Sequence, residues 1–270
     1  MENQAKSALK IYDRRRFRQH VHVYGSDPGV LCLSRLSNAS WQRGLPDRDR
    51  IHLIETLALA EDLGHLFTLT SGLNLAGLLR LWRREPQLAY EHANQSFEIS
   101  EQRDYRFTYA WSRMLRGQAL FDLGQREKGM AELETGFENT RALSTKLMDP
   151  WFAGVLASVK IDNAETGEAK VLLQDAFDTV VETGTTYPLQ ILHCLKGEIA
   201  LKEAWTARHK VNAYESFMTA ASIAHAHGSR AIELRATVGM VTSRRGQPEF
   251  AAAMSSIEDT VAYFTPGEDS

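Results

Sequence analysis

Apolar residues recur along the chain at the three- and four-residue spacing of amphipathic helices. Clear examples are Ile51, Ile54, Leu57 and Ala58, then Met130, Leu133 and Phe137, then Val171, Leu172, Ala176 and Val180. This spacing places the apolar side chains on one face of a helix, which must pack against a neighbouring element. No stretch of useful length alternates apolar and polar residues, so the pattern predicts an all-α chain.

The pattern predicts about twelve helices in two alternating series. The first series covers approximately 29–43, 66–83, 105–122, 149–164, 187–204 and 229–244. The second series covers approximately 47–62, 87–102, 126–143, 167–182, 208–227 and 248–263. The predicted ends carry residues typical of helix boundaries, namely Gly64, Gly184 and Gly228 at C-termini, and the pairs Asp149-Pro150, Tyr187-Pro188 and Thr265-Pro266 at starts or stops.

The second series repeats at a nearly fixed interval. Its helices open at Pro46, Pro86, Arg126, Glu168, Arg208 and Pro248, spaced by 40, 40, 42, 40 and 40 residues. Nine residues earlier, four of the six units carry a small residue, which is Ser37, Gly77, Gly117 or Gly239; the fifth has Gly197 two residues out of phase, and the fourth has Val159. Glycine inside a helix costs about 1 kcal/mol relative to alanine. We therefore predict that these small residues let two helices pack closely.

Helix pairs repeated at a fixed period bury their apolar faces only by stacking on one another. The predicted fold is an all-α α-solenoid, a right-handed superhelix of about six antiparallel helix pairs with a period of ~40 residues and the first helices on its concave side. The predicted domains are an N-terminal helical cap or half repeat over 1–28, a repeat domain over 29–264 and a polar tail over 265–270. The pattern resembles tetratricopeptide (TPR) repeats, although their usual period is about 34 residues.

Four short stretches carry a more particular resemblance. They are Tyr12-Asp13, the run from Tyr24 to Val30 (YGSDPGV), the run from Trp41 to Asp47 (WQRGLPD), and the run from Leu192 to Glu198 (LHCLKGE). Together, over roughly 10–205, they resemble the TPR-like C-terminal region of bacterial signalling ATPases, which are fused to adenylate or guanylate cyclase domains or to LuxR-type regulators. This chain has no GxxxxGK[ST] loop and no recognisable cyclase segment. The resemblance implies a free-standing repeat protein or a sensor region that binds and regulates rather than catalyses.

Composition and charge narrow the partners. The chain is 43% hydrophobic and carries a net charge of -3, so the balance gives no electrostatic footprint for nucleic acid or for an anionic membrane. The one dense basic run, from Arg14 to Arg18, is typical of a solvated helix face. Cys32 and Cys194 are too far apart for a CxxC zinc site, and no signal peptide or membrane span is recognisable. We expect a cytoplasmic protein without cofactor or metal.

No residue pattern indicates catalysis. The pairs His20/His22 and His225/His227 are spaced by two, which puts the rings on different faces of a helix. No serine, cysteine or lysine has a histidine and a carboxylate at a motif spacing. Asp27-Pro28-Gly29 is typical of a helix start. Trp41 and Trp82 are predicted to pack adjacent helix pairs together.

The remaining candidates are residues of the first helices that TPR geometry turns toward a concave groove. They are Ser34, Asn38, Asn74, Met114, Gln118, Lys160 and Glu198, with Leu78 and Met240 at equivalent positions. Amide side chains can donate to and accept from a peptide backbone, although the same pattern also fits a groove that is merely polar. The favoured function is a non-catalytic scaffold or sensor for a protein, peptide or small effector in bacterial signalling or transcription. The alternatives are an enzyme or accessory protein that holds a small molecule between repeats, and a self-associating module or homodimer.

Overall fold

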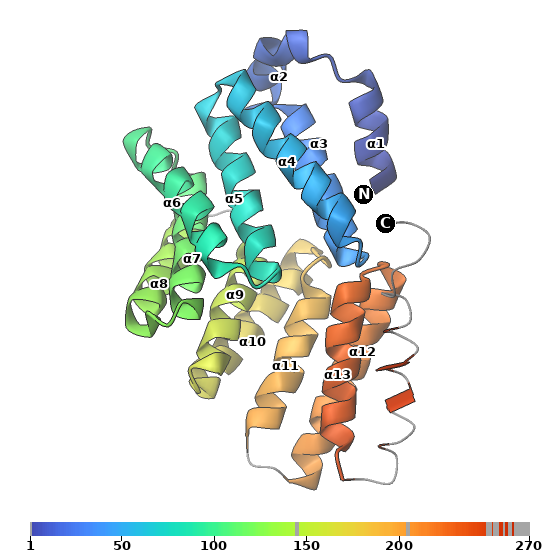
Figure 1. Cartoon of the computed structure of the whole chain (residues 1–270). Coiled ribbons are helices and arrows are strands. Elements are labelled where there is room, and N and C mark those ends of the chain that lie inside the picture. Colours follow the sequence, from blue (N-terminus) through green and yellow to red (C-terminus); the bar gives the residue numbers. More distant parts are fainter. Residues whose placement is uncertain are drawn as a thin grey trace. The chain divides into compact units, whose positions relative to one another are not determined.

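The computed structural model describes residues 2–143, 146–203 and 206–246, and beyond them only residues 250, 254, 255, 257, 258 and 261. Over these residues the chain is helical and has no strand, which confirms the all-α prediction (Figure 1). The elements are α1 (Glu2–Ile11), η1 (Arg14–Arg16), α2 (Phe17–Tyr24), α3 (Pro28–Gln42), α4 (Pro46–Leu63), α5 (Leu66–Trp82), α6 (Pro86–Gln102), α7 (Arg106–Asp122), α8 (Arg126–Ala142), α9 (Asp149–Asp162), α10 (Thr166–Thr183), α11 (Leu189–Lys202), α12 (Ala207–Ala226) and α13 (Arg230–Arg244).

From α3 onward the helices match the two predicted series to within about two residues. The boundaries follow from local chemistry. Pro46 and Pro86 begin α4 and α6, where a missing N–H costs nothing. Gly64 and Gly184 end α4 and α10 at φ values of 63° and 69°, a backbone conformation that favours glycine. The tail over 265–270 and most of the helix predicted over 248–263 lie outside the described residues.

The contacts divide the chain into two compact units. The first unit holds residues up to Trp41 and those from Leu45 to the end of α8. The second unit holds Gln42–Gly44 and the helices from α9 onward. None of the helices described is both long and apolar enough to span a lipid bilayer.

Successive helices of the first unit share an apolar core. Val30 of α3 packs with Ala60 and Leu63 of α4, and Phe17 of α2 lies against them. A second cluster joins α4 to α5 through Leu53, Ala76 and Leu79, with Trp41 and Trp82 at its edge. The two tryptophan rings are 4.6 Å apart between centroids, so they join adjacent helix pairs as predicted.

The small residues of the first helices lie where partner helices come close. Gly117 of α7 faces the backbone of α8, and a Cβ built on it would be 2.7 Å from the Leu133 nitrogen. In the second unit Phe217 of α12 is fully buried and contacts both Gly197 of α11 and Gly239 of α13. Gly197, which the sequence places out of phase, therefore has the same packing role as Gly239, which is in phase.

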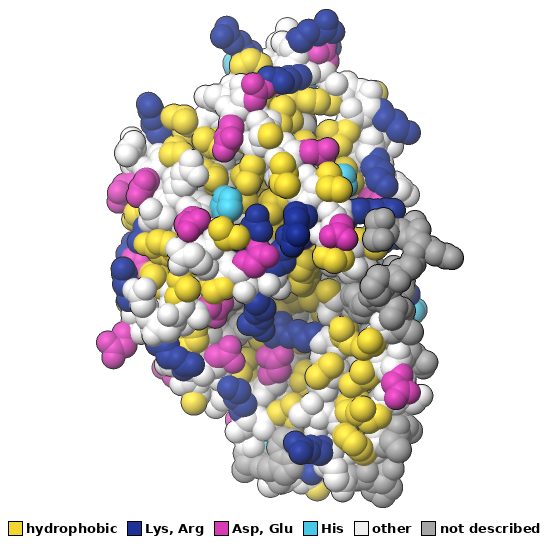
Figure 2. All heavy atoms as spheres, in the orientation of Figure 1, with side chains coloured by type: hydrophobic (Ala, Val, Ile, Leu, Met, Phe, Trp, Pro, Cys, Tyr) yellow, Lys and Arg dark blue, Asp and Glu magenta, His cyan; other side chains and the backbone are white. Residues whose placement is uncertain are grey.

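The basic run from Arg14 to Arg18 lies on the surface of the first unit. Figure 2 shows basic side chains gathered at the top of the view, where η1 and α2 lie, and acidic and basic side chains interspersed elsewhere on that face. Within the run, Arg14 pairs with Asp62 and Arg15 pairs with Asp13. Local carboxylates therefore engage the run, as expected of a solvated charged segment.

Candidate functional site

Several residues predicted to line the groove are buried within their own unit. Asn74 has no exposed surface, and its Nδ2 donates to the Thr108 carbonyl oxygen at 3.0 Å, which links α5 to α7. Ser34 is 1% exposed and donates to the Leu31 carbonyl oxygen. Met114 is 1% exposed and lies directly against Gly136 of α8. Asn74 and Met114 therefore contact a neighbouring helix, whereas the Ser34 bond stays within α3, and all three side chains are almost completely covered in this structure.

The remaining predicted residues either form ion pairs or are only partly exposed to solvent. The Lys160 ammonium is nearly buried and lies 2.8 Å from a Glu165 oxygen and 2.6 Å from a Glu168 oxygen. Glu198 is half-buried and pairs with Arg235 of α13 at 2.8 Å. Asn38 and Leu78 are 8% and 5% exposed, whereas Gln118 and Met240 are half-buried. The structure thus differs from the expectation of an open row of polar side chains, because close packing of neighbouring helices covers most of them.

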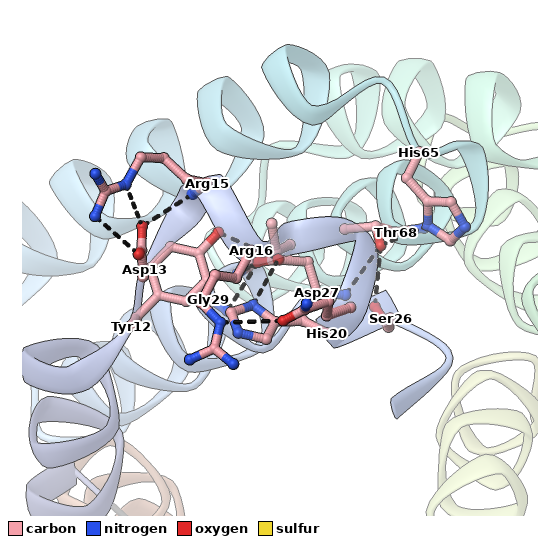
Figure 3. A network of polar contacts seen from close by, with 12 residues as sticks. Tyr12, Asp13, Arg15, Arg16, His20, Ser26, Asp27, Gly29, His65 and Thr68 are labelled. Atoms are coloured by element: carbon pink, nitrogen blue, oxygen red, sulfur yellow. Dashed lines mark hydrogen bonds and ion pairs between the residues drawn. The ribbon is translucent and has the colours of Figure 1, made fainter. Parts of the chain in front are cut away.

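A polar network surrounds Asp27 at the start of α3 (Figure 3). One oxygen of the Asp27 carboxylate, Oδ1, accepts from the backbone N–H groups of Gly29 and Val30 at 2.9 and 3.1 Å. The other, Oδ2, accepts from the Tyr12 hydroxyl at 3.2 Å and lies 3.9 Å from Nδ1 of His20. Asp27 is therefore the predicted helix cap and also fastens the segment before α3 to that helix.

Close packing in the same network explains why position 29, in the YGSDPGV stretch, holds a glycine. The Tyr12 ring lies flat against Gly29, where a Cβ would be only 2.6 Å from Tyr12 Cζ. On the other side, the Asp27 backbone N–H donates to Thr68 Oγ1 at 3.1 Å, so the turn also contacts α5. Tyr12, Asp27 and Gly29 belong to the stretches that carry the family resemblance, and in the structure they hold neighbouring elements together.

The electrostatics of this region keep its reactive groups protonated. Burial, and then the Asp27 charge, raise the pKa of the Tyr12 hydroxyl, so it stays a donor. The same two causes raise the pKa of the Cys32 thiol. In the second unit, burial raises the pKa of Cys194 to about 12. A protonated thiol is a poor nucleophile, so neither cysteine is prepared for covalent chemistry.

An open hollow of about 340 Å³ lies between α10, α11 and α12 of the second unit; we call it the α10–α12 pocket. Its lining residues are Lys170, Leu173, Gln174, Phe177, Lys196, Ile199, Ala200, Glu203, Asn212 and Ser216. Leu173 and Ile199 are 3% exposed and form an apolar floor. The polar side chains surround that floor, which is the usual composition of a ligand-binding hollow.

Of the two lysines that line the α10–α12 pocket, one forms an ion pair with a residue that the structure describes and the other does not. Lys170 pairs with Glu203 at one end. Lys196 lies about two helical turns away, beside Phe177, with its Nζ 6.0 Å from the ring centroid. Among the residues that the structure describes, no carboxylate lies within ion-pair distance of Lys196, and none bonds the exposed Asn212 amide. The pocket therefore offers one available cation and one available amide above an apolar floor.

The His193 ring lies 5.1 Å from the ring of Phe177, which lines the α10–α12 pocket. Burial lowers the pKa of His193, and the Lys196 ammonium lowers it further.

The pKa of His193 gives a prediction for the pH dependence of stability. In the unfolded chain a histidine takes up a proton at a pKa of about 6.5, so the folded state loses stability as the pH falls below that value. We expect the urea midpoint to fall from pH 7.5 to pH 5.5, and to fall less in His193→Gln. An equal fall in both proteins would contradict this assignment.

Within either unit, the residues that the structure describes bring no three His, Cys, Asp or Glu ligand atoms together. Sequence reasoning missed Lys196 and Asn212. Lys196 stands directly before Gly197 in the quoted LHCLKGE stretch, which is a usable signal, whereas nothing in the sequence marks Asn212.

No protein-family model matches the chain, and no curated protein matches it in sequence. Its fold is found among solved structures. The apo form of RapI superposes with a TM-score of 0.63 at 11% identity, covering 96% of this chain and 86% of RapI. Aspartyl phosphate phosphatase F from Bacillus subtilis gives 0.62 at 8% identity, covering 98% of this chain and 66% of the phosphatase. At such identities the likeness concerns the fold alone, and it confirms the predicted TPR-like helical repeat.

Proposed function

We propose that this chain is a non-catalytic binding module whose partner is a protein or peptide. The observation that carries the proposal is the α10–α12 pocket, where the Lys196 ammonium and the Asn212 amide stand beside a floor formed by Leu173 and Ile199. Rigid helices hold these groups, so a ligand meets a site that is largely preformed.

The chemistry of the pocket indicates the kind of peptide. An apolar side chain of the peptide removes the floor from water, and burial of a Leu-sized side chain contributes about 1.5–3 kcal/mol. A neighbouring carboxylate of the peptide accepts from Lys196 and from Asn212, and charge-assisted bonds of this kind are the stronger ones. The proposed ligand is therefore a peptide segment that combines apolar and acidic residues.

A role in bacterial signalling is proposed by analogy. Aspartyl phosphate phosphatase F has a similar fold, and its name says that it is a phosphatase of aspartyl phosphate. The resemblance of the sequence to the TPR-like region of signalling ATPases points to the same setting. In the proposed role the chain senses or recruits a partner, and the signalling output belongs to that partner or to a fused domain.

The test is selection from a displayed library of random twelve-residue peptides on the purified protein. We expect enrichment of peptides with acidic and apolar residues, and loss of their binding to Lys196→Gln. The matched control is Arg208→Gln, which removes one positive charge from α12 outside the pocket and should bind as wild type does. Enrichment of the same peptides on Lys196→Gln, or of none on wild type, would refute the proposal.

A further inference from the structure

A second hollow lies in the first unit, at the ends of α6 and α8 and the start of α7; we call it the α6–α8 pocket. It has a volume of about 370 Å³. Its lining residues are Ser100, Glu101, Asp104, Tyr105, Arg106, Tyr109, Asn139, Ala142 and Leu143. None of them was singled out by the sequence analysis, and none belongs to the α10–α12 pocket.

The charges of the α6–α8 pocket leave one carboxylate available. Arg106 pairs with Asp104 at 3.4 Å, and both side chains are largely exposed. Glu101 is also exposed, and within the described part of the chain no cation lies at ion-pair distance from it. The charged residues that line the pocket therefore sum to one negative charge, at a site open to water. Outside the lining, Arg113 donates to the Tyr109 hydroxyl at 3.5 Å and pairs with Glu132.

Backbone dipoles add to the negative potential. α6 ends at Gln102 and α8 ends at Ala142, so the C-termini of two helices meet at the pocket. The last carbonyl groups of a helix carry partial negative charge and favour a cation nearby. The N-terminus of α7 carries partial positive charge, but two helix C-termini lie at the pocket and only one N-terminus, so the negative contribution is larger.

Two tyrosine rings stand in the pocket, and each is fixed by an aromatic neighbour. Tyr105 meets Phe67 of α5 edge to face, with centroids 5.3 Å apart. Tyr109 packs on Phe97 of α6 at 4.7 Å. Rings held in this way lose little freedom when a cation binds over them. Beside the pocket, the Arg116 guanidinium already lies 4.0 Å from the Phe97 ring centroid, so this aromatic layer accommodates a guanidinium.

We propose that the α6–α8 pocket binds the guanidinium or ammonium group of a basic peptide side chain. Glu101 supplies the opposite charge, Tyr105 and Tyr109 supply ring faces, and the Asn139 carbonyl oxygen accepts a hydrogen bond from the cation. This site stands on its own residues and does not depend on peptide binding at the α10–α12 pocket.

The test uses acetyl-arginine amide as the probe and follows backbone amide resonances of the ¹⁵N-labelled full chain. We expect saturable shifts at residues 100–109 and 139–143. Acetyl-citrulline amide has nearly the same shape without the charge, and it should cause no saturable shift at these residues. Equal shifts from both compounds would overturn the proposal without any mutation.

Single substitutions test which side chains of the α6–α8 pocket contribute to binding of acetyl-arginine amide. Glu101→Gln and Tyr109→Leu should each weaken binding of the arginine compound by about threefold or more. Glu98→Gln is the matched control, because it removes the same charge from α6 outside the lining residues, and it should leave affinity unchanged. Equal affinity of Glu101→Gln and wild type would refute the charge assignment. Tighter binding of the free diamine putrescine than of acetyl-arginine amide would reassign the site from a peptide side chain to a small amine.

Discussion

Replacing Gly117 by alanine should cost the first unit about 2–4 kcal/mol of stability, more than most single substitutions. The added Cβ would lie 2.7 Å from the Leu133 nitrogen and 2.8 Å from the Gly129 carbonyl oxygen, both backbone atoms of α8. Backbone in a packed helix cannot move aside like a side chain, so α7 and α8 must separate. We expect a large fall in the urea midpoint measured by far-ultraviolet circular dichroism.

Gly77 provides the matched control, because it occupies the same position one repeat earlier. A Cβ there would be 3.4 Å from the Ala89 carbonyl oxygen and 3.5 Å from Leu115 Cδ1, which are ordinary contacts. Gly77→Ala should therefore stay within about 1 kcal/mol of wild type, and the higher helix propensity of alanine favours a gain. Equal losses in the two variants would show that repeat position alone, and not the measured approach of α7 and α8, sets the cost.

This contrast shows what the sequence can and cannot predict about the fold. Helix boundaries depend on local chemistry, such as Pro46 at a helix start or Gly64 at a helix end, and they were predicted to within about two residues. The sequence marks Gly77 and Gly117 as equivalent. The distance between neighbouring helices differs at the two positions because it depends on every side chain between them, and a periodic pattern does not contain that information.

The candidate site was less predictable for the same reason. TPR register assigns Asn74 to a helix face, but it does not reveal that the Thr108 carbonyl oxygen of the next repeat lies 3.0 Å away. A side chain that looks available for a peptide is thereby committed to packing. Conversely, Lys196 and Asn212 come together with Phe177 only because three helices meet around one hollow. The residues of such a site have no characteristic spacing in the sequence, so the site is found only in the three-dimensional structure.

Replacing Asp27 by alanine should cost about 2–4 kcal/mol and release the segment before α3. The fully buried Asp27 carboxylate accepts two backbone bonds at the start of α3 and a third from Tyr12. Loss of a helix cap costs about 1 kcal/mol, and each buried donor left without a partner adds about 1–3 kcal/mol. We expect faster tryptic cleavage in the exposed run from Arg14 to Arg18, at a urea concentration where wild type is resistant.

Two milder variants separate the functions of this carboxylate. Asp27→Asn keeps a carbonyl oxygen for the Gly29 and Val30 N–H groups, so it should retain most of the stability of α3. Tyr12→Phe keeps the ring against Gly29 and removes only the hydroxyl, so it should cost about 1 kcal/mol. If Asp27→Asn were as unstable as Asp27→Ala, the negative charge near His20 would be the essential feature, and the cap would be secondary. Cleavage of Asp27→Ala at the wild-type rate would mean that packing of Phe17 against Val30 suffices to hold the segment.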